Sequence, residues 1–315
     1  MRVLVTGGAG FIGLHVARAL LDRGDSVVIV DNFNDYYDPR RKEERILRIP
    51  EANVIRGDVA DAEFMKTVFE QHVFDRICHL AAQAGVRYSI EQPLIYEHAN
   101  VRGMLVILEM ARKHNVSLVY ASSSSVYGNN AKVPFSEADP VNEPISLYAA
   151  TKRSCELMAY TYHHLYGVQS TGLRFFTVYG PWGRPDMAPL KFVESISKGQ
   201  PIDVYGNGDM ARDFTYIVDI VTGVLAALDT PFPYEIFNLG GDNPVRLLDF
   251  IAAIEQALGK KAIMHMLPLQ SSDVKVTMAD ISKAKKRLGF SPKTGIGEGM
   301  RLVADWYRTY CTQDR

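Results

Sequence analysis

The chain has 315 residues, of which 47% are hydrophobic and 23% are charged, and its formal net charge is −1. This composition excludes disordered, collagen-like and low-complexity proteins. The balanced charge gives no sign of nucleic acid or of an anionic membrane as a partner. No apolar stretch reaches the ~18 residues of a membrane span. The first strand begins too early to leave room for a targeting segment, so we expect none.

Three scattered cysteines, Cys78, Cys155 and Cys311, lack the spacing of a disulfide framework or of a zinc motif. The histidines also lack carboxylates or cysteines at ligand spacing, so we expect no metal site. A reducing, cytoplasmic location fits this cysteine usage best.

The first half of the chain alternates short β-branched runs with longer amphipathic stretches. Strands are expected at residues 3–5, 26–30, 54–55, 76–80 and 118–121, and helices at 11–22, 62–71 and 100–114. This alternation predicts an α/β fold with a Rossmann-like, doubly wound parallel sheet.

A glycine-rich loop, GGAGFIG, lies at residues 7–13 between the first strand and the first helix. Glycines allow the sharp turn and the close backbone approach that a pyrophosphate at a helix N-terminus requires. Asp31 ends the second strand, where a carboxylate binds ribose hydroxyls and repels a 2′-phosphate. The pattern indicates a dinucleotide site that takes NAD rather than NADP.

Tyr148 and Lys152 are four residues apart, so both side chains lie on one face of a helix. A lysine ammonium beside a phenol favours the phenolate, which makes the tyrosine a general base near neutral pH. Serines at positions 122–125 precede this pair. One of their hydroxyls is expected to hold the substrate oxygen or to relay its proton.

After about residue 180, prolines and glycines divide the chain into short segments. We therefore expect an NAD-binding domain at residues 1–180 and a smaller, substrate-binding C-terminal lobe at residues 181–315. Such chains usually cross back between lobes, so the boundary is not expected to be clean.

These motifs, together with HLAA at residues 79–82, resemble the extended short-chain dehydrogenase/reductases. Within that family, five segments resemble UDP-glucuronate 4-epimerases. They are DNFNDYYDP (31–39), AAQAGVRYSIEQP (81–93), YASSSSVYG (120–128), YAATK (148–152) and GLRFFTVYGPWGRPDMA (172–188). The likeness covers nearly the whole chain, and the last segment is its most specific part.

The resemblance implies a role for each matching residue. Tyr148 matches the catalytic base, Lys152 its partner and Ser123 the catalytic serine. The residues that match NAD-binding positions are Gly7, Gly10, Phe11, Ile12, Asp31, Asn32, Asp58, Val59, Leu80, Ala81, Ala82, Asn100, Tyr148 and Lys152. The residues expected to bind a UDP-sugar are Arg87, Ser123, Ser124, Ser125, Tyr148, Thr177, Arg184 and Arg212, the last of which matches an arginine that grips the nucleotide pyrophosphate.

Two serines argue against dehydration and decarboxylation, the other reactions that this superfamily carries out on nucleotide sugars. All its nucleotide-sugar members begin by oxidising the carbon-4 hydroxyl to a ketone. A 4,6-dehydratase then needs further acid and base groups. Family dehydratases place an Asp-Glu pair just before Val-Tyr-Gly, and decarboxylases tend to have a glutamate there. This chain has Ser124 and Ser125 at that point. Hydroxyls are poor acids and bases at neutral pH, so epimerisation fits better than elimination.

A uronic acid adds a hazard, because a ketone at carbon 4 makes the sugar a β-keto acid that can lose carbon dioxide. The enzyme must hold the carboxylate so that its breaking bond is not aligned with the carbonyl π system. Arg184 is the residue expected to do so, since a guanidinium clamps a carboxylate bidentately. Arg87 is a second candidate.

The sequence thus predicts an isomerase that inverts carbon 4 of UDP-glucuronate to give UDP-galacturonate, reversibly, with NAD and with no net redox change. The alternatives are a 4-epimerase of neutral sugars such as UDP-glucose and UDP-galactose, a UDP-glucuronate decarboxylase, and an NAD-sensing binding protein. A sensor has no need of a catalytic base, which argues against the last. The resemblance also implies a homodimer, paired through helices near residues 100–114 and 149–165.

Overall fold

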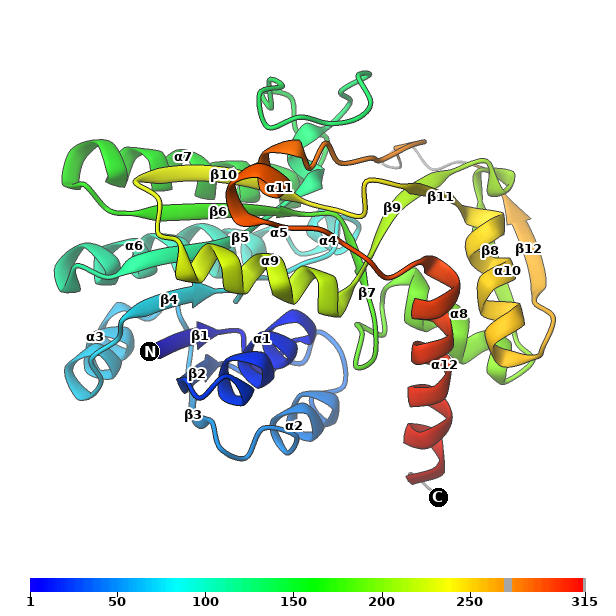
Figure 1. Cartoon of the computed structure of the whole chain (residues 1–315), viewed down its shortest axis with the longest axis horizontal. Coiled ribbons are helices and arrows are strands. Elements are labelled where there is room, and N and C mark those ends of the chain that lie inside the picture. The colour runs from blue at the N-terminus through cyan, green and yellow to red at the C-terminus, as the bar shows by residue number, and fades with distance from the viewer. Residues whose placement is uncertain (269–273, 314–315) are drawn as a thin grey trace.

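The structure is a computed structural model that describes residues 1–268 and 274–313. Its centre is a seven-stranded sheet of order β10-β6-β5-β4-β1-β2-β3, in which every neighbouring pair is parallel (Figure 1). The strands are β1 (Arg2–Thr6), β2 (Ser26–Asp31), β3 (Asn53–Arg56), β4 (Arg76–His79), β5 (Ser117–Ser123), β6 (Ser170–Phe175) and β10 (Tyr234–Leu239). The Rossmann-like, doubly wound sheet expected from the sequence is confirmed.

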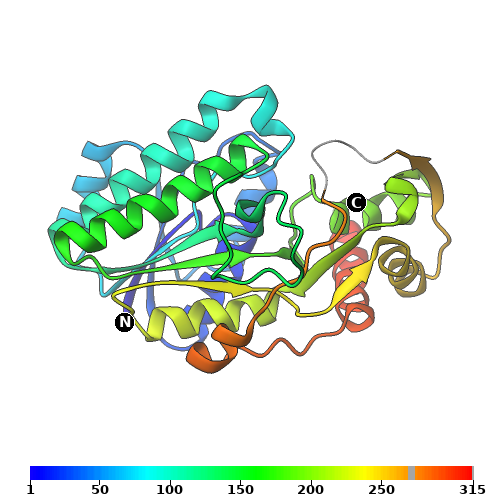
Figure 2. The ribbon, with the colours of Figure 1, turned by 90° about the horizontal axis from the view of Figure 1, so that it is seen from above.

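Apolar side chains on both faces of the sheet account for its burial between two layers of helices. Along β1, Val3 and Val5 pack into the core on one face and Leu4 packs into the core on the other. The helices of the first face are α1 (Phe11–Asp22) and α9 (Ile217–Asp229), and those of the second are α3 (Ala62–Gln71), α6 (Gly103–His114) and α7 (Leu147–Tyr166) (Figure 2).

Helices α1 and α3 occupy the residues predicted for them, whereas the helix predicted at 100–114 differs at its start. Residues Glu97–Arg102 form a π-helical turn, η1, and α6 begins only at Gly103. Within this turn the Asn100 side chain is buried, accepts from the backbone N–H of Gln83 at 2.8 Å and donates to Thr151 Oγ1 at 3.0 Å. Wide turns of this kind are rare and are not visible in the hydrophobic periodicity.

Other short helical segments lie in the connections between the longer elements. They are α2 (Arg40–Ile46), α4 (Tyr88–Glu91), α5 (Pro93–Tyr96), η2 (Ser124–Tyr127) and α11 (Ser282–Leu288).

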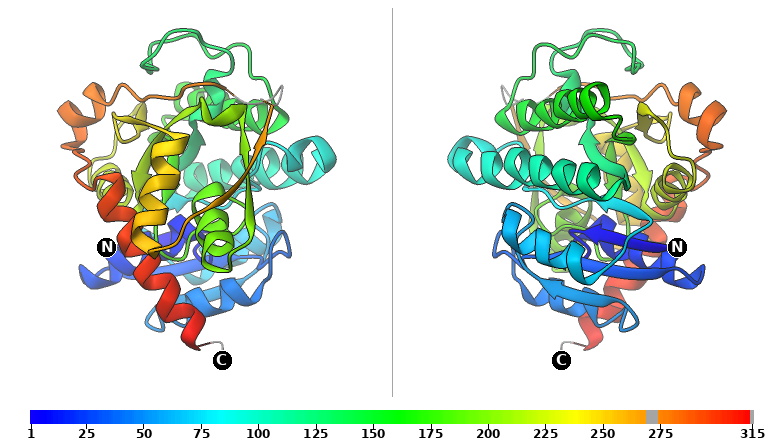
Figure 3. Two further views of the ribbon diagram at one scale, coloured as in Figure 1. Left: turned by 90° about the vertical axis from the view of Figure 1, so that its right-hand side faces the viewer. Right: turned by 90° about the vertical axis from the view of Figure 1, so that its left-hand side faces the viewer.

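A smaller lobe continues from the carboxyl end of β6. Its elements are β7 (Thr177–Tyr179), α8 (Ala188–Ser197), β8 (Pro201–Tyr205), η3 (Gly206–Gly208), β9 (Ala211–Tyr216), β11 (Pro244–Arg246), α10 (Leu247–Leu258), β12 (Ile263–Leu267) and α12 (Ile296–Gln313). They form a three-stranded sheet of order β11-β9-β7 and a two-stranded sheet of β12 and β8, with α10 packed beside α12 (Figure 3). Between these elements, α9 and β10 return to the large sheet.

His79 joins the carboxyl ends of two central strands. Its Nδ1 lies 2.8 Å from Thr6 Oγ1, and the same hydroxyl accepts from the backbone N–H of Ala81 at 3.2 Å. The imidazole is buried, and this burial, assisted by the charge of Lys152, lowers the pKa of His79 to about 3. The ring therefore stays neutral in the folded protein at pH values where an unfolded chain would protonate it.

This difference predicts a loss of stability in mild acid. Below the ordinary histidine pKa of about 6.5, the unfolded state binds a proton at His79 that the folded state does not bind. The free energy of unfolding should therefore fall by about 1.4 kcal/mol per pH unit from this residue alone, or about 2 kcal/mol between pH 7.5 and pH 5. Urea unfolding of the wild type and of His79→Gln at both pH values measures this loss, which the variant should lack. An equal pH dependence in both proteins would contradict the assignment.

Candidate active site

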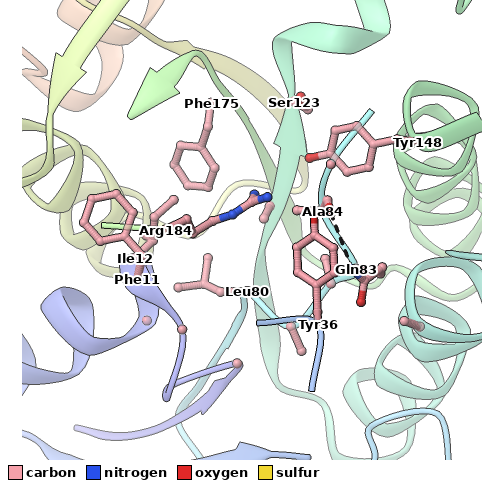
Figure 4. A pocket seen from close by; sticks show the side chains of 18 of the residues that line it. Phe11, Ile12, Tyr36, Leu80, Gln83, Ala84, Ser123, Tyr148, Phe175 and Arg184 are labelled. Carbon is pink, nitrogen blue, oxygen red and sulfur yellow. Dashed lines mark hydrogen bonds between the residues drawn. The ribbon is translucent and has the colours of Figure 1, made fainter. Parts of the chain in front are cut away.

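A cavity of about 350 Å³ opens at the carboxyl ends of β1, β2, β4, β5 and β6 (Figure 4). In doubly wound folds this edge of the sheet is where ligands bind. Of the site residues predicted from the sequence, all except Asn100, Arg87 and Arg212 line this cavity.

The glycine-rich loop is shaped for close packing and for an anion. Gly7 has φ +71°, and a Cβ atom there would lie 2.6 Å from the backbone nitrogen of Ala81. A Cβ atom on Gly13 would lie 2.2 Å from the carbonyl oxygen of Gly7. Helix α1 follows with no side-chain cap at Gly10, so its first backbone N–H groups are available to a ligand at the cavity wall. This arrangement fits a pyrophosphate.

Asp31 is buried beside this loop. Its Oδ2 accepts from the backbone N–H of Ala9 at 3.1 Å and its Oδ1 from that of Phe33 at 2.9 Å. Burial raises the pKa of Asp31, while these bonds and the nearby Lys42 oppose the rise. Lys42 also lines the cavity, donating to the carbonyl oxygen and to Oδ1 of Asn34 at 2.8 and 2.7 Å. Lys42 was not predicted from the sequence, because nothing in the local pattern distinguishes it from its charged neighbours.

Asp58 and Val59 form another part of the cavity wall, together with the segment 80–82 after β4, which lies against Gly7. The Asp58 carboxylate accepts from the backbone N–H of Ala60 at 2.9 Å and lies 2.9 Å from His98 Nε2. Asn100 lies behind this wall and bonds Gln83, which does line the cavity.

Helix α7 brings Tyr148 and Lys152 to the cavity on one face. Lys152 is buried, and its Nζ donates to the carbonyl oxygen of Ala121 in β5 at 2.9 Å. Ser123 ends β5, and its Oγ accepts from the backbone N–H of Ser125 at 3.1 Å. Figure 4 shows the Tyr148 hydroxyl directed toward Ser123. The three predicted catalytic groups therefore lie together at one end of the cavity.

A buried ion pair supports this helix from behind. Glu156, one helical turn after Lys152, accepts from Arg174 of β6 through Oε1 at 2.8 Å and Oε2 at 2.9 Å. Ser122 of β5 donates to the same carboxylate at 2.7 Å. Burial opposes ionisation of Glu156, but the hydrogen bonds and charge of Arg174 lower its pKa. The pair holds α7 against β6, and the Ser122 bond ties the same carboxylate to β5, the strand that ends at Ser123.

Arg184 extends into the cavity from the loop after β7, between Tyr36 and Phe175 (Figure 4). Asp186 already binds its guanidinium: Nε donates to Oδ1 at 3.0 Å and Nη2 to Oδ2 at 2.5 Å. The Tyr36 hydroxyl donates to Asp186 Oδ2 at 3.0 Å. Burial opposes the charge of Arg184, but Asp186 raises its pKa. Tyr36 and Asp186 were not predicted as site residues, although both lie in segments that resemble UDP-glucuronate 4-epimerases.

Arg45 of α2 connects two loops that line the cavity, the glycine-rich loop and the loop after β7. Its fully buried guanidinium donates through Nη1 to the carbonyl oxygen of Ala9 at 3.1 Å and to the Tyr37 hydroxyl at 2.6 Å. Through Nη2 it donates to the carbonyl oxygens of Trp182 and Gly183 at 2.8 and 3.2 Å. The glycine-rich loop and the loop after β7 are thereby bonded to one side chain.

Two predicted substrate residues lie outside the cavity lining. The Arg87 guanidinium lies 4.9 Å from the centre of the Tyr205 ring in the smaller lobe. Arg212 donates to the carbonyl oxygens of Ala211 and Lys275, both at 3.1 Å. The roles of Arg87 toward the sugar carboxylate and of Arg212 toward the nucleotide pyrophosphate stay predictions.

Within residues 1–268 and 274–313, no group of three or more His, Cys, Asp or Glu side chains is arranged to hold a metal ion. None of the helices in this part of the chain has the length and apolar character that a membrane crossing requires.

A sequence profile of the NAD dependent epimerase/dehydratase family matches residues 3–240. The chain belongs to this family. It is 46% identical over 334 residues to UDP-glucuronate 4-epimerase 4 of Arabidopsis thaliana. The alignment covers 99% of this chain and 76% of that relative. The resemblance found in the sequence is therefore confirmed.

Two solved structures of such epimerases have the same fold as this chain. One is UDP-glucuronic acid 4-epimerase from Bacillus cereus in complex with UDP-glucuronic acid and NAD, with a TM-score of 0.92, 34% identity and coverage of 98% of this chain and 100% of that one. The other is UDP-glucose 4-epimerase of Thermotoga maritima with UDP-glucose, with a TM-score of 0.90, 31% identity and coverage of 99% and 100%. Because epimerases of charged and neutral sugars share this fold, the sugar must be distinguished by side chains.

Proposed function

We propose that this protein is an isomerase that inverts carbon 4 of UDP-glucuronate to give UDP-galacturonate, reversibly and without net redox change. The observation that supports this best is the presence of Arg184 in the same cavity as Ser123, Tyr148 and Lys152. A guanidinium suits the carboxylate of a uronic acid, whereas a neutral hydroxymethyl group has no use for it. The similarity to the Arabidopsis and Bacillus enzymes supports the same substrate.

The cofactor side of the cavity fits NAD. The glycine-rich loop and the N-terminus of α1 would hold its pyrophosphate, Asp31 and Asn32 its adenosine ribose, and Asp58 and Val59 its adenine. The segment 80–82, Asn100 and Lys152 would enclose the rest. When bound, NAD supplies the acceptor and donor for the hydrogen on carbon 4.

Tyr148 acts as the general base at its phenolic oxygen, taking the proton from the carbon-4 hydroxyl. Lys152, four residues later on the same helix face, stabilises the phenolate by its charge. Ser123 holds the substrate oxygen at the end of β5. The 4-keto sugar then turns over in the cavity, and Tyr148 returns a proton to the oxygen after the hydrogen has been added to the opposite face.

Arg184 holds the carboxylate of the sugar, and Ser124, Ser125 and Thr177 supply hydroxyl groups around it. Holding the carboxylate out of alignment with the carbon-4 carbonyl suppresses decarboxylation. Arg87 is the second candidate for the carboxylate, and Arg212 of the smaller lobe would bind the pyrophosphate of UDP.

Replacing Tyr148 tests the assignment. Tyr148→Phe keeps the ring and removes the base, so turnover should fall at least ~100-fold. Purified protein is incubated with UDP-glucuronate, first without and then with added NAD, and products are followed by proton NMR. Tyr160→Phe, an exposed tyrosine on the same helix, serves as the matched control with unchanged turnover.

Near-normal turnover in Tyr148→Phe would contradict the role of this residue. A UDP-pentose product from the wild type would indicate a decarboxylase. Conversion of UDP-glucose but not of UDP-glucuronate would indicate a 4-epimerase of neutral sugars.

We infer further that the protein is a cytoplasmic homodimer. The outer faces of α6 and α7, which lie side by side over one face of the sheet (Figure 2), expose the apolar side chains of Leu105, Leu157, Tyr160, Leu165 and Tyr166. Apolar surface of this kind is stabilised when a partner covers it. The free, buried thiols of Cys78 and Cys155 suit a reducing compartment.

A charge on this face should separate the dimer. Leu157→Glu places a carboxylate at the centre of the proposed interface, and light scattering coupled to size exclusion should show a monomer in place of the wild-type dimer. Leu47, directly after α2, is also an exposed leucine, so Leu47→Glu is the control and should remain dimeric. A monomeric wild type would contradict the inference.

A further inference from the structure

We propose that Asp186 is a resident counter-ion of Arg184, which limits how tightly the sugar carboxylate is held and so allows the 4-keto sugar to turn over. The inference rests on the proposed function, because it assumes that Arg184 binds the carboxylate of UDP-glucuronate. It identifies Asp186 as a positioning residue that acts through Arg184.

The geometry of the pair leaves room for a second carboxylate. A guanidinium has five N–H donors in a rigid fork, and Asp186 binds the edge formed by Nε and Nη2. The guanidinium is directed into the cavity, between Tyr36 and Phe175 (Figure 4). A sugar carboxylate entering the cavity therefore meets an arginine whose charge is already balanced.

Asp186 is itself held in place. The Tyr36 hydroxyl donates to its Oδ2, and burial together with the Asp186 charge raises the pKa of Tyr36 to about 12. The phenol thus stays protonated and remains a donor at neutral pH. The Tyr36 ring also lies 5.9 Å from the Arg184 guanidinium carbon. Asp186 is therefore bonded both by Arg184 of its own loop and by Tyr36 of the loop after β2.

The rotation of the sugar during epimerisation explains why an Arg184–Asp186 pair is useful. To present its opposite face, the 4-keto sugar must leave the position in which its carboxylate is bound and then return. If Arg184 had no other partner, each departure would leave an unpaired charge on a side chain that is only 21% exposed, which costs free energy. With Asp186 beside it, Arg184 remains paired throughout. Two carboxylates sharing one guanidinium also bind the sugar less tightly than a lone guanidinium would.

Removing the charge of Asp186 tests this directly. Asp186→Asn should lower the KM for UDP-glucuronate about tenfold, since it removes one negative charge from the vicinity of the bound carboxylate. The same variant should lower kcat by a similar factor, because the sugar is released more slowly for its rotation. Asp186→Glu, which keeps the charge, should restore most of the wild-type kcat.

Two further measurements separate charge from structure. On a Tyr148→Phe background, where turnover is suppressed, calorimetry should show that Asp186→Asn tightens UDP-glucuronate about tenfold and leaves UDP-glucose unchanged. Asp38→Asn removes a carboxylate that pairs with Arg40 instead, so it changes the net charge equally and should change neither constant.

The outcomes are distinct. Unchanged constants in Asp186→Asn would overturn the proposal. So would a higher KM for both sugars with a lower melting temperature, since that is what a purely structural clamp of the loop predicts. Wild-type turnover of UDP-glucuronate is measured first, and its absence would overturn the proposed function together with this inference.

Discussion

One buried guanidinium, that of Arg45, joins the cofactor side of the cavity to its substrate side. Its hydrogen bonds reach Ala9 in the glycine-rich loop, and Trp182 and Gly183 in the loop after β7. A buried cation that loses its partners is strongly destabilising, so these bonds hold both loops in one arrangement. The distance between NAD and the UDP-sugar in the proposed complex therefore depends on Arg45, although Arg45 does not line the cavity.

The catalytic groups depend on a second buried pair in the same way. Glu156 and Arg174 bind α7 to β6, and Ser122 adds β5 to the same carboxylate. General base catalysis tolerates little displacement of the base from its substrate, since misplacement by about 1 Å costs about 100-fold in rate. Rigid support behind the cavity contrasts with the proposed carboxylate subsite, where Arg184 pairs with Asp186 and where our proposal requires the sugar to move.

The parts of this account that the sequence predicted are those in which chemistry follows local pattern. The loop at residues 7–13, Asp31 and the Tyr148–Lys152 spacing each lie within one strand–helix unit, and the bounds of α1 and α3 follow from hydrophobic periodicity. Arg45 was not predicted, because the two loops that it joins, at Ala9 and at Gly183, lie 36 and 138 residues away in the chain. The same holds for Tyr36, whose partner Asp186 is 150 residues away. The return of β10 to the large sheet is likewise set by tertiary packing.

The proposed epimerisation requires that carbon 4 alone reacts and that its hydrogen never exchanges with solvent. Proton NMR of UDP-glucuronate incubated with the enzyme in deuterium oxide tests this most directly. We predict UDP-galacturonate that keeps protium at carbons 4 and 5. Deuterium at carbon 5 would show proton removal there, and deuterium at carbon 4 would show exchange of the transferred hydrogen with water; either result would contradict the account.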